Sequence, residues 1–323
     1  MRRLIVLVAV LAVGACTGGS PAPPGPDGTD GPRWRRLADA PSERTEVAAA
    51  AAGTDIAVVG GYQGSGPTVS TVEILDTATG QWSQGPDLPQ AVNHAMAASV
   101  NGEVHVFGGY LDSQTPTAAA YRLDGPAWVP VAPMPAGRAA GTAVAVGGSV
   151  YVAGGIGPDG LANDMFVYDA GADRWSTAPG PPTRREHLGG AGFGAIVYTV
   201  GGRASGVSGI LSAFEAYDTA TRTWARLPDL PTPRGGLAAS ATCNGLVVAV
   251  GGEARSTFPE AEAFDTRTRT WSSLPELPTP RHGLGVVAVG TTLYTLAGGP
   301  RPGLHVSAAT EAIDLGSRGT CSS

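Results

Sequence analysis

Six tryptophans are spread along this chain at a nearly constant interval. They lie at positions 34, 82, 128, 175, 224 and 271, so neighbouring copies are 46 to 49 residues apart. Gly-Gly pairs that end short apolar runs recur in phase with the tryptophans, and the first glycines of these pairs are residues 60, 108, 154, 201, 251 and 298. A fixed period of this length indicates a repeat architecture, in which each copy is one supersecondary unit.

The clearest copy of the repeat runs from Trp224 to Trp271. Its apolar runs and turn residues predict four short strands, at 236–243, 246–252, 260–266 and 270–273. Nothing in the pattern has the longer helical period that a βαβ unit requires. Four antiparallel strands in about 45–50 residues predict one blade of a β-propeller, and therefore an all-β fold.

The two ends of the repeat array complement each other. The sixth copy has a third strand at 309–314 but no tryptophan after it, whereas Trp34 has no strands of its own copy before it. We therefore expect the strand around Trp34 to be the fourth strand of the last blade. This closes a six-bladed β-propeller of four-stranded antiparallel blades and leaves no free sheet edge.

The combined pattern resembles the kelch repeat. Gly-Gly closes the second strand, an aromatic residue precedes Asp in the third strand, as in Tyr217-Asp218, and Trp follows six residues after that Asp. The resemblance covers about residues 33–315, although Arg122-Leu123-Asp124 departs from it. It implies a propeller that binds a ligand or protein at the mouth of its central channel, where the loops that enter the first strands meet the loops between second and third strands.

The first 32 residues resemble a bacterial lipoprotein leader followed by a tether. Two arginines at positions 2 and 3 precede an apolar run of ten residues, and the sequence VGAC that ends at Cys16 is similar to a lipobox. The resemblance implies a signal peptide over 1–15, lipidation of Cys16, and a Gly/Pro-rich tether over 16–32. We expect the protein to be exported and lipid-anchored on the outer face of the cell membrane. An ordinary secretory signal with an incidental cysteine is the alternative.

Two further cysteines, Cys243 and Cys321, lie beyond the leader. An even number in an exported chain predicts a disulfide. Cys243 lies at a turn of the fifth blade, and Cys321 lies in a tail (317–323) that leaves the propeller (33–316) at the sixth. Two unpaired thiols are the alternative. The net charge of −6 and the lack of a basic tract make nucleic acid an unlikely partner, and we expect a monomer.

An arginine lies ten residues after the tryptophan in five of the six copies. These residues are Arg44, Arg138, Arg185, Arg234 and Arg281, and the exception, Val92, is followed by Asn93 and His94. Five guanidiniums around one channel mouth would bind a carboxylate, a phosphate, an acidic peptide or a glycan that carries an acid. In the alternative interpretation they pair across blades with the third-strand acids Glu73, Glu215, Glu262 and Glu311.

Histidines and variable loop residues complete the set of candidate binding residues. His94, His187 and His282 fall where the chain enters a first strand, and Arg203, Glu253, Arg255 and Arg301 lie on the loops between second and third strands. Tyr62, Tyr110 and His305 lie on the same loops. The five histidines show no HxH, HxxxH or HExxH spacing, so the sequence predicts neither a metal site nor another cofactor.

These features favour a binding module over an enzyme. No catalytic motif is present, and the candidate binding residues are those of a recognition surface. One alternative is a sugar epimerase or mutarotase similar to the kelch-like proteins that interconvert sialic acid anomers, in which Glu253 with Arg255, or Glu186 with Arg185, would supply the acid–base carboxylate and its arginine. A second alternative is a structural protein of the cell envelope.

Overall fold

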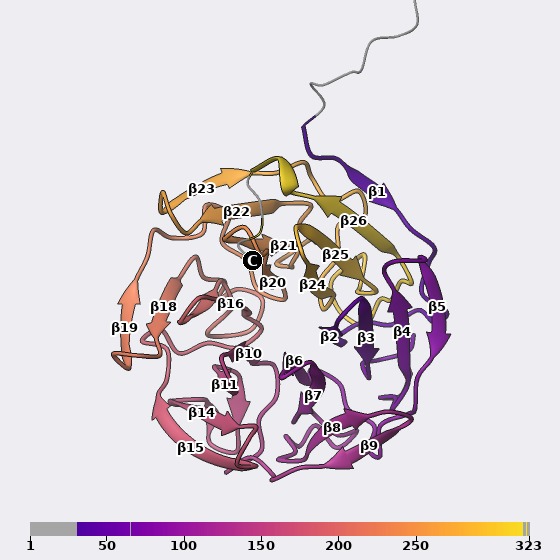
Figure 1. The fold of residues 1–323 in the computed structure, drawn as a ribbon, viewed down its shortest axis with the longest axis vertical. Helices are drawn as coiled ribbons and strands as arrows, with labels where there is room; N and C mark the ends of the chain where they lie inside the picture. Colours follow the sequence, from indigo (N-terminus) through magenta and orange to yellow (C-terminus); the bar gives the residue numbers. More distant parts are fainter. Residues whose placement is uncertain (1–30, 65, 319–320, 322–323) are drawn as a thin grey trace, which may run out of the picture. The chain divides into compact units, whose positions relative to one another are not determined.

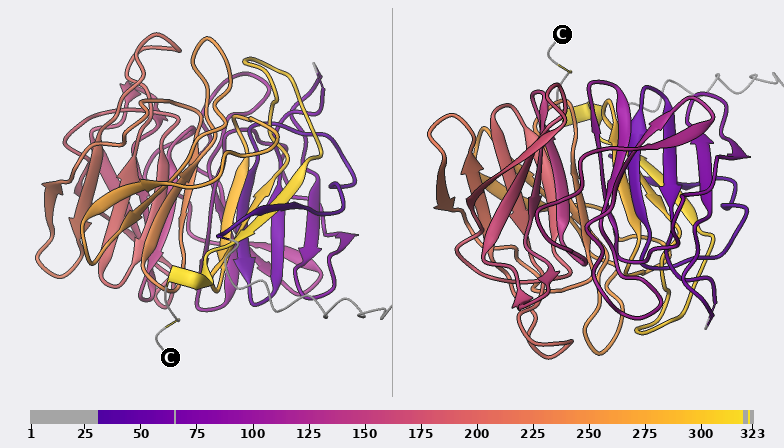
Figure 2. Two further views of the ribbon diagram at one scale, coloured as in Figure 1. Left: turned by 90° about the horizontal axis from the view of Figure 1, so that it is seen from above. Right: turned by 90° about the horizontal axis from the view of Figure 1, so that it is seen from below.

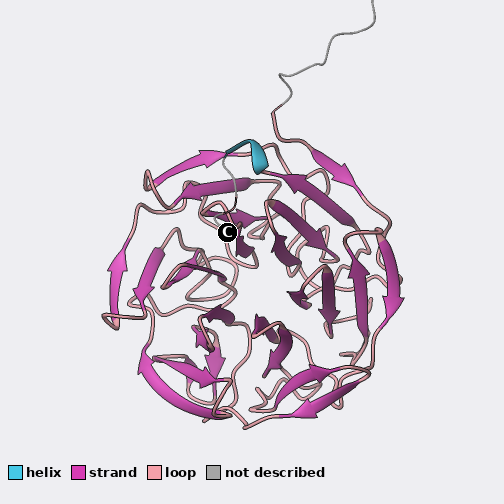
Figure 3. Ribbon diagram, in the orientation of Figure 1, coloured by secondary structure: helices cyan, strands magenta, loops and turns pink. Residues whose placement is uncertain are grey.

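The computed structural model describes residues 31–64, 66–318 and 321, and nearly all of their regular structure is β-strand (Figures 1 and 3). Residues 32 onward form a ring of six four-stranded antiparallel sheets. This arrangement confirms the predicted all-β, six-bladed propeller. A 3₁₀ turn at Gly316–Arg318 is the one helical element within the described ranges, and no helix there has the length and apolar character needed to cross a bilayer.

Each blade is formed by strands that follow one another in the chain. Blade 1 contains β2 (Ala48–Ala52), β3 (Asp55–Val59), β4 (Val72–Asp76) and β5 (Gln81–Gln84), and blade 2 contains β6 (Met96–Val100), β7 (Glu103–Phe107), β8 (Ala120–Asp124) and β9 (Ala127–Pro130). Blade 3 contains β10 (Thr142–Val146), β11 (Ser149–Ala153), β14 (Asp164–Asp169) and β15 (Arg174–Pro179), with a small hairpin of β12 (Ile156–Gly157) and β13 (Gly160–Leu161) between its second and third strands.

Blades 4 and 5 repeat the same order. Blade 4 contains β16 (Gly189–Phe193), β17 (Ile196–Val200), β18 (Phe214–Asp218) and β19 (Thr223–Arg226), and blade 5 contains β20 (Ala238–Ala241), β21 (Leu246–Val250), β22 (Ala261–Asp265) and β23 (Thr270–Ser273). The strands predicted for the fifth copy agree with those of blade 5 to within two residues at each end.

Blade 6 joins the two ends of the ring. It contains β24 (Gly285–Val289), β25 (Thr292–Leu296), β26 (Thr310–Asp314) and, at its outer edge, β1 (Trp34–Arg36). β1 pairs antiparallel with β26, with Trp34 opposite Ile313 (Figure 1). The prediction that the strand around Trp34 closes the ring is confirmed.

The first strand of every blade lies nearest the centre of the ring (Figure 1), and this position explains why these strands are rich in Ala and Gly. A Cβ added to Gly285 would lie 2.7 Å from the Cβ of Ala49 in the next blade, and one added to Gly189 would lie 2.9 Å from the Cβ of Ala239. Contacts this short leave no room for a larger side chain. Small residues therefore allow six blades to converge around a narrow channel.

Each tryptophan ties its blade to the one before it. Its indole Nε1 donates to the carbonyl of the residue four positions after the preceding tryptophan, at 2.7 to 3.0 Å, in all six copies. Trp271 donates to Pro228, for example, and Trp34 donates to Pro275 across the closure of the ring. The tryptophan is thus both an aromatic filler between blades and a hydrogen-bond donor.

Two features require glycine in the pair after the second strand: neighbouring backbone atoms lie very close, and φ is positive. Gly60 (φ 63°) and Gly61 (φ 96°) illustrate it: an added Cβ would lie 2.4 Å from a backbone oxygen at either position. In the sixth copy these two positions are taken by Ala297 (φ 53°) and Gly298 (φ 101°), so the predicted pair at 298–299 is one residue too late.

A disulfide joins Cys243, in the turn between β20 and β21, to Cys321 in the tail, with a Cα–Cα distance of 4.9 Å. This confirms the predicted pairing. Asn244 Nδ2 donates to Leu315 O (3.1 Å), so blade 5 also contacts the residue that follows β26, just before the tail. Cys16, the predicted lipidation site, lies outside the described residues.

Candidate functional site

The propeller has two different faces. Seen from its edge, its strands run between them (Figure 2). One face, called the loop face below, carries the loops that enter each first strand and the loops between second and third strands. The opposite face carries the tight turns. Variable loops held by a rigid scaffold are where binding residues are most often found.

A cavity of about 310 Å³ occupies the channel and is lined by the first strands of all six blades. Its lining along the strands is mostly Ala, Gly and Val, whereas Glu46, His94 and His187 line it at the loop face. Small side chains therefore line the channel along the strands, and ionisable side chains lie at one mouth.

The backbone at this mouth forms a closed belt. The residue twelve positions after each tryptophan has a positive φ, between 51° and 65°, in every blade, and these residues are Glu46, His94, Ala140, His187, Gly236 and Gly283. Each one from His94 onward donates its N–H to the carbonyl of its counterpart in the preceding blade, and Val47 N–H closes the belt on Gly283 O at 3.2 Å. A non-glycine residue in this conformation costs about 1–3 kcal/mol and is typical of functional sites.

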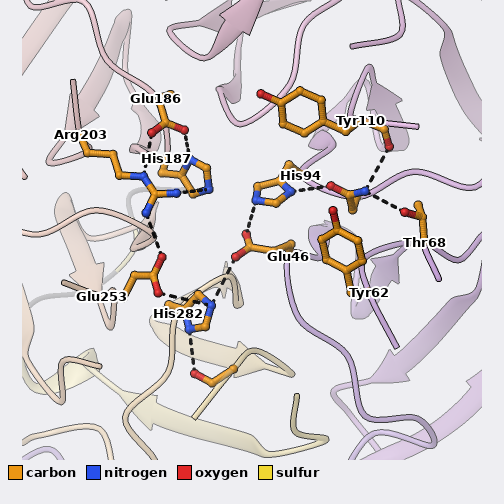
Figure 4. A network of polar contacts seen from close by, with 12 residues as sticks. Glu46, Tyr62, Thr68, His94, Tyr110, Glu186, His187, Arg203, Glu253 and His282 are labelled. Atoms are coloured by element: carbon orange, nitrogen blue, oxygen red, sulfur yellow. Dashed lines mark hydrogen bonds and ion pairs between the residues drawn. The ribbon is translucent and has the colours of Figure 1, made fainter. Parts of the chain in front are cut away.

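Seven side chains meet at the belt. We call them the mouth cluster, and they are Glu46, His94, Glu186, His187, Arg203, Glu253 and His282 (Figure 4). They come from the loops entering blades 1, 2, 4 and 6 and from the loops between second and third strands of blades 4 and 5.

His94 is held at both nitrogens of its ring (Figure 4). Its Nδ1 lies 2.6 Å from Asn93 Oδ1, while Asn93 Nδ2 donates to Thr68 Oγ1 (2.8 Å) and Tyr110 O (3.4 Å). Because this orientation presents the carboxamide oxygen, which can only accept, His94 Nδ1 carries a proton. Nε2 of His94 then faces Glu46 Oε2 at 3.1 Å.

Arg203 occupies the other half of the cluster. Its Nε donates to Glu186 Oε1 (2.7 Å), its Nη1 to Glu253 Oε1 (2.9 Å), and its Nη2 to His187 Nε2 (2.9 Å). Since Nε2 of His187 accepts from the guanidinium, Nδ1 is the protonated nitrogen and donates to Glu186 Oε2. The contacts fix the tautomer of His187.

His282 lies between two carboxylates and is almost fully buried. Its Nδ1 donates to Gly299 O (3.1 Å), and its Nε2 lies 3.4 Å from Glu46 Oε1 and 3.7 Å from Glu253 Oε2. Among the described residues, that second oxygen of Glu253 accepts no hydrogen bond, although the residue is only 5% exposed. A buried acceptor without a donor is uncommon and calls for a specific explanation.

Burial and neighbouring charged groups shift the pKa values of His94 and Glu46 in the mouth cluster. Burial lowers the pKa of His94 to about 4, and the nearby Glu46 offsets this only in part, so His94 is neutral at pH 7. Burial alone would raise the pKa of Glu46, but His94, His187, His282 and Arg203 around it hold that pKa at about 2. Glu46 is therefore a carboxylate at physiological pH.

The five repeated arginines do not lie open at the mouth. They are at most 3% exposed, and each binds an acid of its own blade at 2.5 to 2.9 Å: the pairs are Arg44–Glu73, Arg138–Asp164, Arg185–Glu215, Arg234–Glu262 and Arg281–Glu311. Backbone carbonyls of the same blade accept further hydrogen bonds from the Nη atoms, as Gly60, Thr71 and Val58 do for Arg44, whereas Nε of Arg44 and of Arg138 has no hydrogen-bond partner among the described residues. The geometry supports pairing rather than anion binding, and the pairs form within blades rather than across them.

The loop residues are divided between cluster and surface. Arg203 and Glu253 belong to the mouth cluster, while Arg255 and Arg301 are exposed on the loop face. The two acid–base pairs considered for a mutarotase are separated, because Arg185 binds Glu215 and both Glu186 and Glu253 bind Arg203.

Sequence reasoning missed Glu46, which lies nearest the centre of the histidines. Glu46, His94 and His187 offer ligand atoms that all lie within 4.8 Å of one another, so they could hold a metal ion. The signal that could have found Glu46 is its position: it lies twelve residues after Trp34, as His94 and His187 lie after their tryptophans.

Comparison with known proteins agrees with this geometry. The family described as "KLHDC2/KLHL20/DRC7 Kelch-repeats domain" matches residues 46–229, more than half of the chain, and "Kelch motif" matches residues 234–278. The chain belongs to the kelch-repeat family. The kelch fold and the loop face together indicate a protein- or ligand-binding module.

Individual kelch relatives are similar over part of their length. Kelch-like protein terF of Aspergillus terreus is 31% identical over 238 residues, which cover 68% of this chain and 52% of that protein. Kelch-like protein 35 of Mus musculus is 26% identical over 224 residues, covering 68% of this chain and 37% of that protein. The match thus spans about half of the first relative and about a third of the second.

Proposed function

We propose that this kelch propeller is an extracytoplasmic, lipid-anchored binding module whose partner docks on the loop face. The observation that carries the proposal is the placement of exposed apolar side chains. Val207 (47% exposed) lies on the loop between β17 and β18, and Leu304 (49%) lies on the loop between β25 and β26. These two side chains are available to contact apolar groups of a partner that docks on the loop face.

Charge on the same face gives the expected chemistry of the partner. Arg255 and Arg301 are exposed on loops of blades 5 and 6, whereas the repeated arginines are buried. Exposed guanidiniums bind carboxylates and acidic sugars in a bidentate manner. A peptide or glycan that combines apolar and acidic groups therefore fits the loop face best.

A binding screen on the whole chain, solubilised in detergent, tests this function. Peptides, glycans and small organic acids are the probes. Any ligand found should bind at least tenfold more weakly to Val207→Asp/Leu304→Asp and to Arg255→Ala/Arg301→Ala. Val129→Asp is the matched control, because Val129 is also an exposed apolar residue (37%) but lies on the outer strand β9. Failure of every probe to bind, or equal effects in the control, would contradict the proposal.

The location rests on the leader and has its own test. An inhibitor of lipoprotein signal peptidase should cause accumulation of the unprocessed chain, and Cys16→Ser should prevent labelling by a clickable fatty acid. If Cys16→Ser is instead processed normally, to the mass of the mature unchanged chain without its lipid, the leader is an ordinary secretory signal.

A further inference from the structure

The three histidines of the mouth cluster share one arrangement. In each, Nδ1 donates to a fixed acceptor: Asn93 Oδ1 for His94, Glu186 Oε2 for His187 and Gly299 O for His282. Each Nε2 then points into the cluster, as Figure 4 shows. Histidines that ligate metals have this arrangement, because a hydrogen bond at one ring nitrogen fixes the tautomer and orients the other.

Two of the inward-facing nitrogens lie beside the carboxylate of Glu46. Nε2 of His94 lies 3.1 Å from Glu46 Oε2, and Nε2 of His282 lies 3.4 Å from Glu46 Oε1. Imidazole nitrogens and carboxylate oxygens are thus grouped at one buried point, and both are donor atoms that divalent transition metals accept.

We propose that Glu46, His94 and His187 bind one divalent transition-metal ion at the channel mouth. Their ligand atoms already lie within 4.8 Å of one another, and ligands at about 2.0–2.2 Å from a tetrahedral Zn²⁺ lie about 3.3–3.6 Å apart, so the atoms must approach by about 1 Å. Small side-chain rotations bring the three atoms into range.

The donor set selects the class of ion. Two imidazole nitrogens and one carboxylate oxygen suit Zn²⁺, Co²⁺, Ni²⁺ or Cu²⁺, whereas Mg²⁺ and Ca²⁺ prefer oxygen ligands alone. His282 Nε2 lies 3.4 Å from Glu46 Oε1 and 3.7 Å from Glu253 Oε2, which accepts no hydrogen bond among the described residues. Either group can act as a fourth ligand or bind a metal-bound water.

Arg203 competes with the ion for one ligand. Its Nη2 donates to His187 Nε2 at 2.9 Å, so metal binding requires this contact to open, while Glu186 and Glu253 continue to hold the guanidinium. The guanidinium therefore limits the affinity. This gives the site a distinctive property: removing Arg203 should strengthen metal binding, and removing a histidine should weaken it.

Metal titration of the whole, untagged chain tests the site. After chelator treatment, isothermal titration with Zn²⁺ should give one equivalent, and Co²⁺ should give visible d–d absorption typical of a low-coordinate N/O site. Glu46→Gln and His94→Gln should each weaken binding tenfold or more, whereas Arg203→Gln should tighten it. Circular dichroism establishes that each variant is folded, and Asn93→Ala, which removes only the orienting hydrogen bond of His94, should weaken binding about 10–100-fold.

His305→Gln is the matched control, because His305 is an exposed histidine on a loop of the same face. It should bind Zn²⁺ and Co²⁺ as the unchanged chain does. The proposal is overturned if folded protein takes up no stoichiometric Zn²⁺ or Co²⁺, if His305→Gln abolishes binding, or if His94→Gln leaves the Co²⁺ spectrum unchanged. Partner binding on the outer loops is measured separately, so either proposal can fail alone.

Discussion

At the scale of single residues, the most consequential feature is the buried ion pair that recurs through the blades. In Arg281–Glu311 both side chains are fully buried, the Nη2–Oε2 distance is 2.7 Å, and burial lowers the pKa of Arg281 to about 10 even though Glu311 counters it. The same guanidinium donates to the carbonyls of Ala297 and Ala309. One arginine thereby connects the second and third strands of its blade.

We predict that Glu311→Leu destabilises the propeller by about 3–5 kcal/mol, because it leaves the Arg281 guanidinium buried without a counter-charge. Urea denaturation followed by circular dichroism measures the loss. Arg301→Ala, at an exposed arginine, should change the stability by less than about 0.5 kcal/mol. A loss in Glu311→Leu as small as that of the control would show that the pair has no structural role.

The same pair marks a limit of sequence reasoning. The period placed an arginine near five of the six first strands, and two outcomes were open: a guanidinium at the channel mouth or one paired with an acid across blades. The structure shows pairing within each blade. The choice depends on side-chain torsions and on the carbonyls within reach, which no spacing encodes. Glu46 shows the same limit, because a lone acid attracts attention only once the ring brings His94 and His282 beside it.

At the scale of elements, the strand that carries each tryptophan is fixed by one hydrogen bond to the neighbouring blade. We predict that Trp271→Phe costs about 1–2 kcal/mol. The ring contacts with Phe214 and Phe264 largely persist, but Pro228 O loses its donor. Trp224→Phe should cost the same, because Trp224 makes an equivalent bond to Pro179 O at 2.8 Å. Chemical denaturation measures both, and a neutral effect in both variants would contradict a structural role for the indole N–H.

The turns between third and fourth strands give the blades a dependence on pH. Backbone N–H groups of Thr221 and Ala220 lower the pKa of Asp218, and equivalent turns lower the pKa of Asp76 and Asp265. The folded-state pKa thus lies below the unfolded one. The stability contributed by these carboxylates is present above the unfolded pKa, at about 4, and is lost as pH falls through the folded value.

Asp218→Asn should therefore flatten the acid side of the stability profile. We expect the difference in denaturation midpoint between the variant and the unchanged chain to be largest at neutral pH and to shrink below about pH 4. Urea titrations at several pH values measure it. Asp159→Asn, at an exposed loop position, is the control and should keep the original profile. A pH-independent difference for Asp218→Asn would refute the role of the charge.

At the scale of the whole molecule, sequence reasoning was most successful. The last copy of the repeat lacks its fourth strand, and the strand around Trp34 stands alone at the start of the array. Only one closed arrangement joins them, so blade number, strand order and the closing position of Trp34 were all predictable. Periodic packing residues carry this information because each copy repeats the same contacts. The mouth cluster was not predictable as a unit, since its members come from five blades and share no motif.

A disulfide also attaches the C-terminal tail to blade 5. Cys243 in blade 5 and Cys321 in the tail are 78 residues apart, so their bond encloses β21–β23 of blade 5 and β24–β26 of blade 6 and restricts the unfolded chain over that length. We predict that Cys243→Ser/Cys321→Ser lowers the free energy of unfolding by about 2–4 kcal/mol. Thermal denaturation with and without a reductant measures the effect. The reductant should lower the midpoint of the unchanged chain to that of the double variant and should not affect the double variant itself. If the reductant leaves the unchanged chain as it was, with both thiols shown to be free, the closing strand β1 alone is sufficient to hold the seam.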